Sequence, residues 1–438
     1  MRLRNLLLVL LCLLPFAPAA HALATTPTEA RALAAAAQDH TAYTLPPAAL
    51  ARAETLATTR HIVYFGGILW SVGSLWLLLH FRIAARMRNV ANNISKNRWA
   101  QGFTFFLQFL IITTILGLPL EIYSHHIQRA YGLSVQHWGS WLGDQAKGFG
   151  LTLLFGFLGV MLLFGLLRKF PRRWWLLLSL AIMVFTVIGV LITPYVIDPL
   201  FNKFEPLSNS NPALVQQLEQ VVARGKSVKI PPERMFLMKA SDKVTTLNAY
   251  VTGFGASKRV VVWDTSIAKG TPDEILFIFG HEMGHYVLGH ILTGILFSFV
   301  LILVSFFLGY HALQYLLRRF GPQWRIPTQD NWAALVVFVL VLNVFSFFIS
   351  PVANAFSRAH EHAADVYGME AVHGIVAIPQ VSGQQAFQLL GENSYSVPDP
   401  NPLVEFWTGS HPPIWLRAAF ARHYDPWAAA EQPKYFTK

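Results

Sequence analysis

The sequence predicts a mainly α-helical, polytopic membrane protein: a membrane helical bundle of about six spans joined to a small α+β domain. Charged residues are 13% of the 438 residues, about half the usual share in soluble domains, and hydrophobic residues reach 54%. Six apolar segments are long enough to cross a hydrocarbon core of about 30 Å. The predicted spans are residues 62–81, 103–120, 149–167, 174–197, 291–313 and 332–352.

The N-terminus predicts export. Residues 1–24 combine Arg2 and Arg4 with a short apolar core and a small-residue site at Ala22 and Ala24, which is typical of a cleaved signal peptide. A retained anchor is the alternative. We expect an exported N-terminal segment at 25–61 with one or two short helices. Next comes a predicted four-span membrane domain at 62–197. The last predicted domain, at 198–438, includes the last two spans.

Three loops orient the predicted spans. Residues 82–101, residues 168–173 and the loop between the last two spans hold twelve basic residues and one acidic residue, equal to the net charge of +11. All three fall on one side of a six-span topology, and basic loops mark the cytoplasmic side. The other face, including residues 198–290 and the segment after Pro351, is then periplasmic. The charge therefore indicates topology and not nucleic-acid binding.

The long polar stretch after the fourth span predicts a small α+β unit. Residues 212–223 have a helical pattern, with Asn211 as a candidate cap. Residues 234–238 and 259–263 indicate strands, and residues 248–255 indicate a strand that enters a glycine turn. After the last span, we expect helices around Glu361 and around residues 384–390.

One motif indicates a metal site. His281 and His285 are four residues apart, so on a helix their imidazoles lie on one face and can bind one ion, while Glu282 can reach a water on that ion. Glu361, in a second acidic cluster downstream, can supply the third ligand. Two histidines and one carboxylate leave a fourth position open, which is the pattern of catalytic Zn2+.

This ligand set predicts hydrolysis without a covalent intermediate. Zinc lowers the pKa of its bound water from about 15.7 toward about 7, and Glu282 takes the proton as general base and later delivers it to the leaving amine. Asp365 lies one turn after Glu361 and can accept the outer N–H of a ligating histidine. Asn248, His411 and Arg417 are further candidates: Asn248 to align an extended substrate on an edge strand, the other two to stabilise the oxyanion.

Several spaced motifs add a family resemblance from about residue 62 to about residue 422. They are Gly117-Leu118-Pro119 with Tyr123, residues 199–207, residues 248–250, residues 260–265, the cluster at 361–365, and Ser410-His411-Pro412-Pro413 with Arg417. Together with the motif at 281–285, they make the chain similar to the integral-membrane zinc endopeptidases typified by the type-1 CAAX prenyl protease. The resemblance implies membrane helices wrapped around a large chamber that the catalytic domain closes.

The orientation departs from that family. Its eukaryotic members have a seventh membrane helix at the N-terminus and a cytosolic catalytic domain, whereas the signal-like segment and basic loops here place the domain outside a bacterial-type inner membrane. Prenylated CAAX proteins are cytosolic, so the resemblance transfers reaction type and architecture. The expected partners are membrane lipid and peptide or protein substrates that are exported, membrane-inserted or lipidated, with no nucleic acid.

Some ligand assignments have competitors in the sequence. Glu361 could pair with Arg358 at the surface, and His360 and His362 are rival ligands by proximity. Those two histidines flank Glu361 and cannot share its helix face, so we expect them around the site or in solvent.

Other candidates also have simpler alternatives. Asp365 could be a solvated helix charge, Asn248 a turn residue, and His411 a loop residue before two prolines. His290 is interpreted as an interfacial residue.

Two other functions remain open from the sequence. One is a non-catalytic, zinc-stabilised membrane scaffold or chaperone, for which Glu282 would be dispensable. The other is a transporter, although transporters place polar groups in broken spans at mid-membrane, whereas this cluster lies at span ends.

Overall fold

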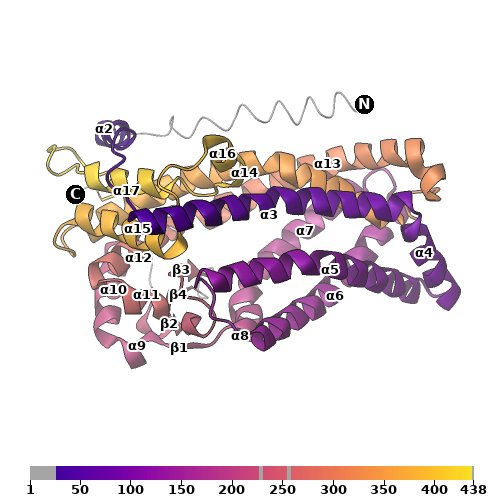
Figure 1. Ribbon diagram of the computed structural model, residues 1–438, viewed down its shortest axis with the longest axis horizontal. Helices are drawn as coiled ribbons and strands as arrows, with labels where there is room; N and C mark the ends of the chain where they lie inside the picture. The colour runs from indigo at the N-terminus through magenta and orange to yellow at the C-terminus, as the bar shows by residue number, and fades with distance from the viewer. Residues whose placement is uncertain (1–25, 226–229, 254–257, 437–438) are drawn as a thin grey trace.

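The computed structural model describes residues 26–225, 230–253 and 258–436, so the predicted signal peptide at 1–24 lies outside the described residues. Long helices form an elongated bundle, and a small sheet with shorter helices lies at one end (Figure 1). In the described chain, six helices are long and apolar enough to cross a membrane, which confirms the predicted class. They are α3 (Pro47–His80), α5 (Arg98–Ala130), α6 (Trp138–Lys169), α7 with its continuation (Trp174–Phe201), α13 (His290–Trp324) and α14 (Ala334–Val372).

The spanning helices extend well beyond the predicted spans. Helix α3 begins at Pro47, so the segment before the first span contains one separate short helix, α2 (Pro27–Ala36). Helix α14 continues through Pro351 to Val372 and carries both the sixth span and Glu361. After α7 (Trp174–Ile192), a π-helical turn at Thr193–Ile197 leads into α8 (Asp198–Phe201).

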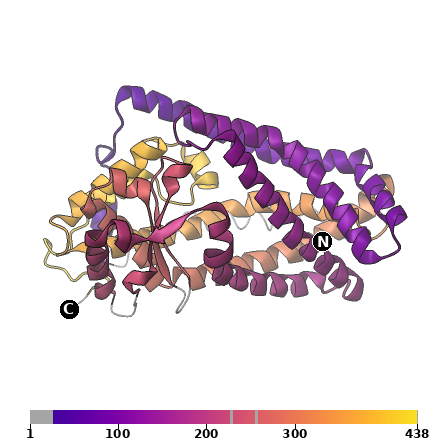
Figure 2. The same cartoon turned by 90° about the horizontal axis from the view of Figure 1, so that it is seen from below.

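The bundle is open and not tightly packed. In the most apolar stretch of each spanning helix, 11–28% of the residues are buried for five of the helices. The corresponding share for α14 is 44%. The remaining residues of these stretches are partly or fully exposed. Figure 2 shows the long helices extending away from the sheet and its shorter helices, which gather at one end of the molecule.

The three basic loops meet at the end of the bundle opposite the sheet. The first contains helix α4 (Ile83–Ile94), which Figure 1 shows at this end. Arg82 Nε donates to the carbonyl of Gln323 (3.0 Å), and Gln329 Nε2 donates to the carbonyl of Pro171 (3.0 Å). These bonds join all three loops at one end of the bundle.

A four-stranded sheet with strand order β1-β2-β4-β3 forms the α+β unit. The strands predicted at 234–238, 248–255 and 259–263 are β2 (Met235–Met238), β3 (Ala249–Thr252) and β4 (Arg259–Trp263), whereas β1 (Phe204–Pro206) has no sequence signal. Strands β2 and β4 are parallel, and β1 and β3 pair antiparallel at the two edges. Strand β3 is therefore an edge strand, as expected for the segment after Asn248.

Shorter helices complete this unit. The predicted helix at 212–223 is α10 (Pro212–Arg224); Pro212 is its first residue, but the Asn211 side chain makes no capping bond. The predicted helix at 384–390 is part of α15 (Pro379–Ser394). The others are α9 (Leu207–Ser210), 3-10 turns at Pro232–Arg234 and Ala240–Asp242, α11 (Asp264–Lys269), α12 (Pro272–Val287), α16 (Pro402–Thr408) and α17 (Ile414–His423).

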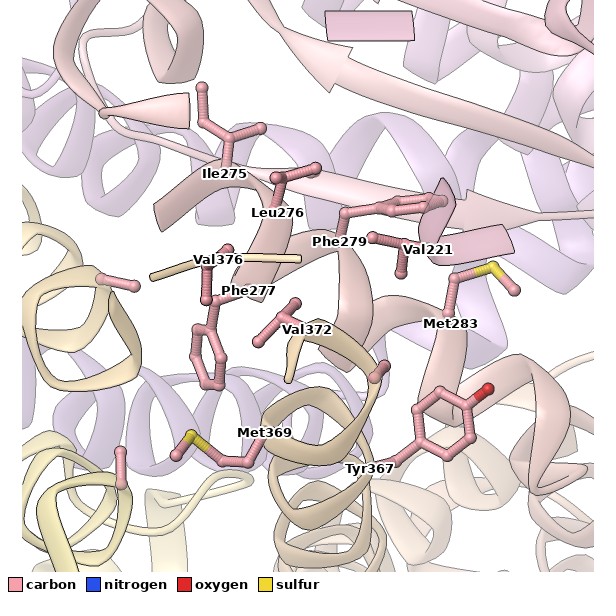
Figure 3. Packing of buried hydrophobic residues seen from close by; sticks show 14 of the residues in the cluster. Val221, Ile275, Leu276, Phe277, Phe279, Met283, Tyr367, Met369, Val372 and Val376 are labelled. Carbon is pink, nitrogen blue, oxygen red and sulfur yellow. The ribbon is translucent and has the colours of Figure 1, made fainter. Parts of the chain in front are cut away.

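Helix α12 is the centre of the hydrophobic core of this unit. Phe279 and Met283 of α12 are completely buried in the same cluster as Val221 of α10. On another side, Phe277 lies near Met369 and Val372 of α14 (Figure 3). The core thus clamps α12 between α10 and α14.

Helices α12 and α14 cross at glycines. A Cβ on Gly368 would lie 2.9 Å from the backbone nitrogen of His281, and one on Gly280 would lie 3.2 Å from the carbonyl oxygen of Gly368. A Cβ on Gly284 would lie 3.0 Å from the Cβ of Tyr367. Only small residues permit this separation of the two backbones.

Helix α2 packs against α17 and reaches α14 through Glu29. The Glu29 carboxylate is fully buried, where it meets His362 Nε2 and Lys434 Nζ, each at 2.9 Å. Tyr43, just after α2, is also fully buried and donates to the carbonyl of Ser396 (2.7 Å). The N-terminal segment from Pro27 therefore belongs to the folded domain.

We expect Gly368→Ala to force α12 and α14 apart. The added methyl group would meet backbone atoms that cannot rotate away, so we expect a loss of about 1–3 kcal/mol from overpacking. The apparent melting temperature and the metal content of the purified protein should both fall. Gly294→Ala is the control, because nothing lies within 4 Å of a Cβ at that position; equal behaviour of the two variants would contradict this account.

The docking of α2 should depend on pH. Burial raises the pKa of Glu29, but hydrogen bonds and charges from His362 and Lys434 outweigh it and lower the pKa from 4.5 to about 2. Because the folded-state pKa lies below the unfolded value, the stabilisation is complete above about pH 4.5 and is lost as the pH falls toward 2. In this window, we expect the apparent melting temperature to drop more steeply for the wild type than for Glu29→Gln; parallel profiles would refute the assignment.

Candidate metal centre

The helix that carries the motif is well defined at both ends. Thr271 and Glu274 form a capping box at the start of α12, with Pro272 as the first helical residue. The helix ends at Val287, and Gly289, with φ of +72°, allows the chain to turn into α13. His281 and His285 thus lie in the last two turns, on one face of a rigid helix.

Three predicted ligands converge where α12 crosses α14. The Nε2 atoms of His281 and His285 lie 3.1 Å apart. His281 Nε2 is 3.4 Å from Glu361 Oε2, and His285 Nε2 is 3.3 Å from Glu361 Oε1. His281 and Glu361 are each 7% exposed, so this cluster is enclosed by protein.

The geometry of this cluster fits a metal ion. Ligand atoms bound at about 2.0–2.2 Å to a tetrahedral ion lie roughly 3.3–3.5 Å apart, close to the separations found here. Glu361 Oε2 is buried and makes no hydrogen bond within the described part of the chain. A buried carboxylate oxygen without a hydrogen bond is costly, and a cation would satisfy it.

Asp365 lies behind His281, on the side away from the other ligands. Its Oδ1 is 2.8 Å from His281 Nδ1, so it can accept the outer N–H of this imidazole. Arg417 makes two hydrogen bonds to the Asp365 carboxylate (2.7 and 2.8 Å) and stacks its guanidinium 4.6 Å from the ring centre of Phe387. Asp365 is 2% exposed, so it is not a solvated helix charge.

Glu282 directly follows His281, and its carboxyl group has no hydrogen bond or ion pair within the described part of the chain. Burial places this group in a low-dielectric environment. Burial raises the pKa of Glu282, and the nearby imidazoles partly oppose this effect. A carboxylate with raised proton affinity next to a metal site suits proton transfer.

The other two candidates lie around this cluster. His411 Nε2 is 3.4 Å from Glu361 Oε1, and its side chain is 57% exposed, so it faces both the cluster and solvent. Asn248 directly precedes β3 and is exposed; its backbone binds Ser266 Oγ and the N–H of Trp263. Its side chain is therefore available at the edge of the sheet.

The rival interpretations of the acidic cluster find no support in these contacts. Arg358 donates to the carbonyl of Gly409 (2.6 Å) and forms no ion pair with Glu361 in the described chain. His362 binds Glu29, and His360 stacks on His290, so neither histidine reaches the cluster. His290, interpreted from the sequence as an interfacial residue, also contacts the proposed ligand His285.

The apolar helical bundle carries two histidines and a glutamate at the ends of its spans. These features are typical of membrane-bound metallopeptidases. The family "Peptidase family M48" matches residues 208–425, and the family "CAAX prenyl protease N-terminal, five membrane helices" matches residues 36–203. The uncharacterized metalloprotease YhfN of Bacillus subtilis (strain 168) is 31% identical over 378 residues, 86% of each chain. The CAAX prenyl protease 1 homolog of Arabidopsis thaliana is 27% identical over 327 residues, 73% of each chain.

The chain belongs to peptidase family M48. In three dimensions, it is similar to the crystal structure of S. mikatae Ste24p, with a TM-score of 0.72 over 94% of this chain and 98% of that chain at 21% identity, which shows a shared fold. The predicted resemblance to the CAAX prenyl protease family is confirmed. The protein is thus a multi-pass membrane metalloendopeptidase.

Proposed function

We propose that this chain is a zinc endopeptidase that hydrolyses peptide bonds of membrane or exported proteins. The observation that carries the proposal is the convergence of His281, His285 and Glu361 at separations suited to a tetrahedral ion, beside Glu282. Two neutral imidazoles and one carboxylate are the donor set of catalytic zinc sites. When bound there, zinc supplies a Lewis acid and lowers the pKa of a coordinated water toward about 7.

The residues around the ion then have separate roles. Glu282 accepts a proton from water at its carboxylate and returns it to the leaving amine nitrogen, which its raised pKa favours. Asp365 holds His281 with its proton on Nδ1, so that Nε2 faces the metal. Arg417 keeps Asp365 ionised and in place through two hydrogen bonds.

Substrate contacts come from the exposed candidates. Asn248 and the free edge of β3 can align an extended peptide as an added strand. His411 lies at the mouth of the cluster, where its Nε2 can donate to the oxyanion of the tetrahedral intermediate. Arg417 supports the same charge from its buried position 3.4 Å from Glu361.

The peptidase domain is proposed to face the periplasm of a bacterial-type inner membrane. The joined basic loops lie at the opposite end of the bundle, which favours a cytoplasmic location for that end. Relatives are named CAAX prenyl proteases; from them we transfer the cleavage of membrane-associated polypeptides, lipidated ones included, and leave the choice of substrate open.

Glu282→Gln should abolish cleavage and leave the metal in place. The amide cannot accept the proton, so we expect kcat to fall by roughly 10²–10⁴-fold. The assay compares wild type and variant on labelled casein and measures zinc per chain by elemental analysis. His281→Ala is the control that should lose metal as well. Equal cleavage by wild type and Glu282→Gln would favour the scaffold or chaperone alternative.

The orientation can be measured with reporter fusions. Alkaline phosphatase is active only outside the cytoplasm, so we expect activity when it is joined after residue 225 and none when it is joined within 168–173. A fluorescent protein that matures only in the cytoplasm should give the reverse pattern. A residue-225 fusion that works only as the cytoplasmic reporter would reject the proposed topology.

A further inference from the structure

His290 contacts the metal ligand His285 on the side away from the cluster. The Nδ1 atoms of the two rings lie 3.0 Å apart, and the rings meet edge to face, with 5.0 Å between centres and 74° between planes. His285 Nε2 meanwhile faces His281 and Glu361. Nε2 of His285 thus faces the proposed metal position, and Nδ1 faces His290.

The turn between α12 and α13 creates this contact. Gly289 adopts φ of +72°, a conformation that costs other residues energy, and nothing lies within 4 Å of a Cβ added there. Backbone conformation, and not crowding, therefore requires glycine. The turn places His290, the first residue of α13, beside the last turn of α12.

Metal binding through Nε2 of His285 determines which nitrogen atoms of the two rings carry protons. A neutral imidazole that binds metal through Nε2 carries its proton on Nδ1, so His285 is the donor. His290 must then accept through Nδ1 and keep its own proton on Nε2. If His290 were the donor, His285 would carry its proton on Nε2 and have no lone pair there for the metal. If neither Nδ1 atom carried a proton, two lone pairs would face each other.

A stacked ring holds His290 in this orientation. His360 of α14 lies parallel to it, with 4.0 Å between ring centres and 0° between planes. His360 Nε2 also lies 3.4 Å from Thr293 Oγ1 of α13. The contact therefore links the start of α13 to the residue that directly precedes the ligand Glu361.

The outer partners of the two histidine ligands differ in charge. His281 faces the carboxylate of Asp365, whereas His285 faces a neutral imidazole. The cluster already contains Glu282, Glu361 and Asp365, and another buried carboxylate would add to their repulsion. A neutral acceptor orients the second ligand without adding charge.

We propose that His290 is a positioning residue of the metal centre, because its Nδ1 accepts the N–H of His285 and fixes the tautomer and ring orientation of this ligand. The inference rests on the proposed function only in taking His285 as a ligand. It predicts an effect on metal affinity that can be measured without any peptide substrate.

The test uses purified full-length protein in detergent and three variants. His290→Phe keeps an aromatic ring against His360 but has no acceptor; His290→Asn keeps an acceptor near the position of Nδ1 but has no ring. His360→Phe is the matched control. Competition with a chelator gives the zinc dissociation constant, and visible absorption of the cobalt-loaded protein reports ligand geometry.

We expect His290→Phe to bind zinc about 10–100-fold more weakly and to change the cobalt spectrum. His290→Asn and His360→Phe should stay close to wild type. Melting in the presence of chelator separates the alternatives: a merely structural role lowers the stability of the metal-free protein, whereas positioning reduces only the stabilisation that zinc adds.

Wild-type zinc affinity in His290→Phe would overturn the inference, and so would an Asn variant as weak as the Phe variant. The His281→Ala variant distinguishes a failure of the proposed metal site from a failure of the role proposed for His290. If it leaves zinc affinity unchanged, then the proposed metal site itself is wrong; if it abolishes binding while His290→Phe binds like wild type, only the role of His290 fails.

Discussion

The structure depends on how closely α12 and α14 approach each other. The proposed metal ligands are divided between them, two histidines on α12 and one glutamate on α14, and short side chains bridge only a narrow gap. Gly280, Gly284 and Gly368 bring the backbones so near that a Cβ at 368 would lie 2.9 Å from a backbone nitrogen of the first ligand. The buried core around Phe279 and Met283 then holds α12 at this distance. The packing of α12 against α14 therefore also determines the distances between the proposed metal ligands.

Contacts around this crossing restrain the ligands further. Asp365 and Arg417 fix one histidine from α14 and α17, and Glu29 of α2 binds His362, the residue next to the proposed ligand Glu361. Since α14 is continuous from the sixth span to Val372, the glutamate lies on an extension of a membrane helix. Position in the bilayer and position of the ligand are thus coupled through one rigid element.

The sequence predicts what depends on local pattern. Hydropathy predicts the six spans, and short β-rich runs with a glycine turn predict three of the four strands. The i, i+4 spacing with one downstream acidic cluster predicts the three convergent side chains. Local pattern does not predict contacts between distant segments. Strand β1 is three residues long and exists because it pairs with β2, the burial of Glu29 depends on a helix more than 300 residues away, and His290 reaches His285 only through the left-handed turn at Gly289. The length of α14 was also missed, because Pro351 suggests an end that packing overrides.

The charges at the crossing explain why a metal ion belongs to this fold. Glu282, Glu361 and Asp365 lie together in an enclosed, partly apolar environment, where three carboxylates repel one another and lose their hydration. Arg417 compensates one of them through a bidentate pair with Asp365. The imidazoles that ligate a metal are neutral, so they add no positive charge. A divalent cation would supply the remaining two positive charges at the point where the buried Glu361 oxygen has no hydrogen bond in the described chain. The same ion that would activate water thus completes the electrostatic balance that lets α12 and α14 lie so close together.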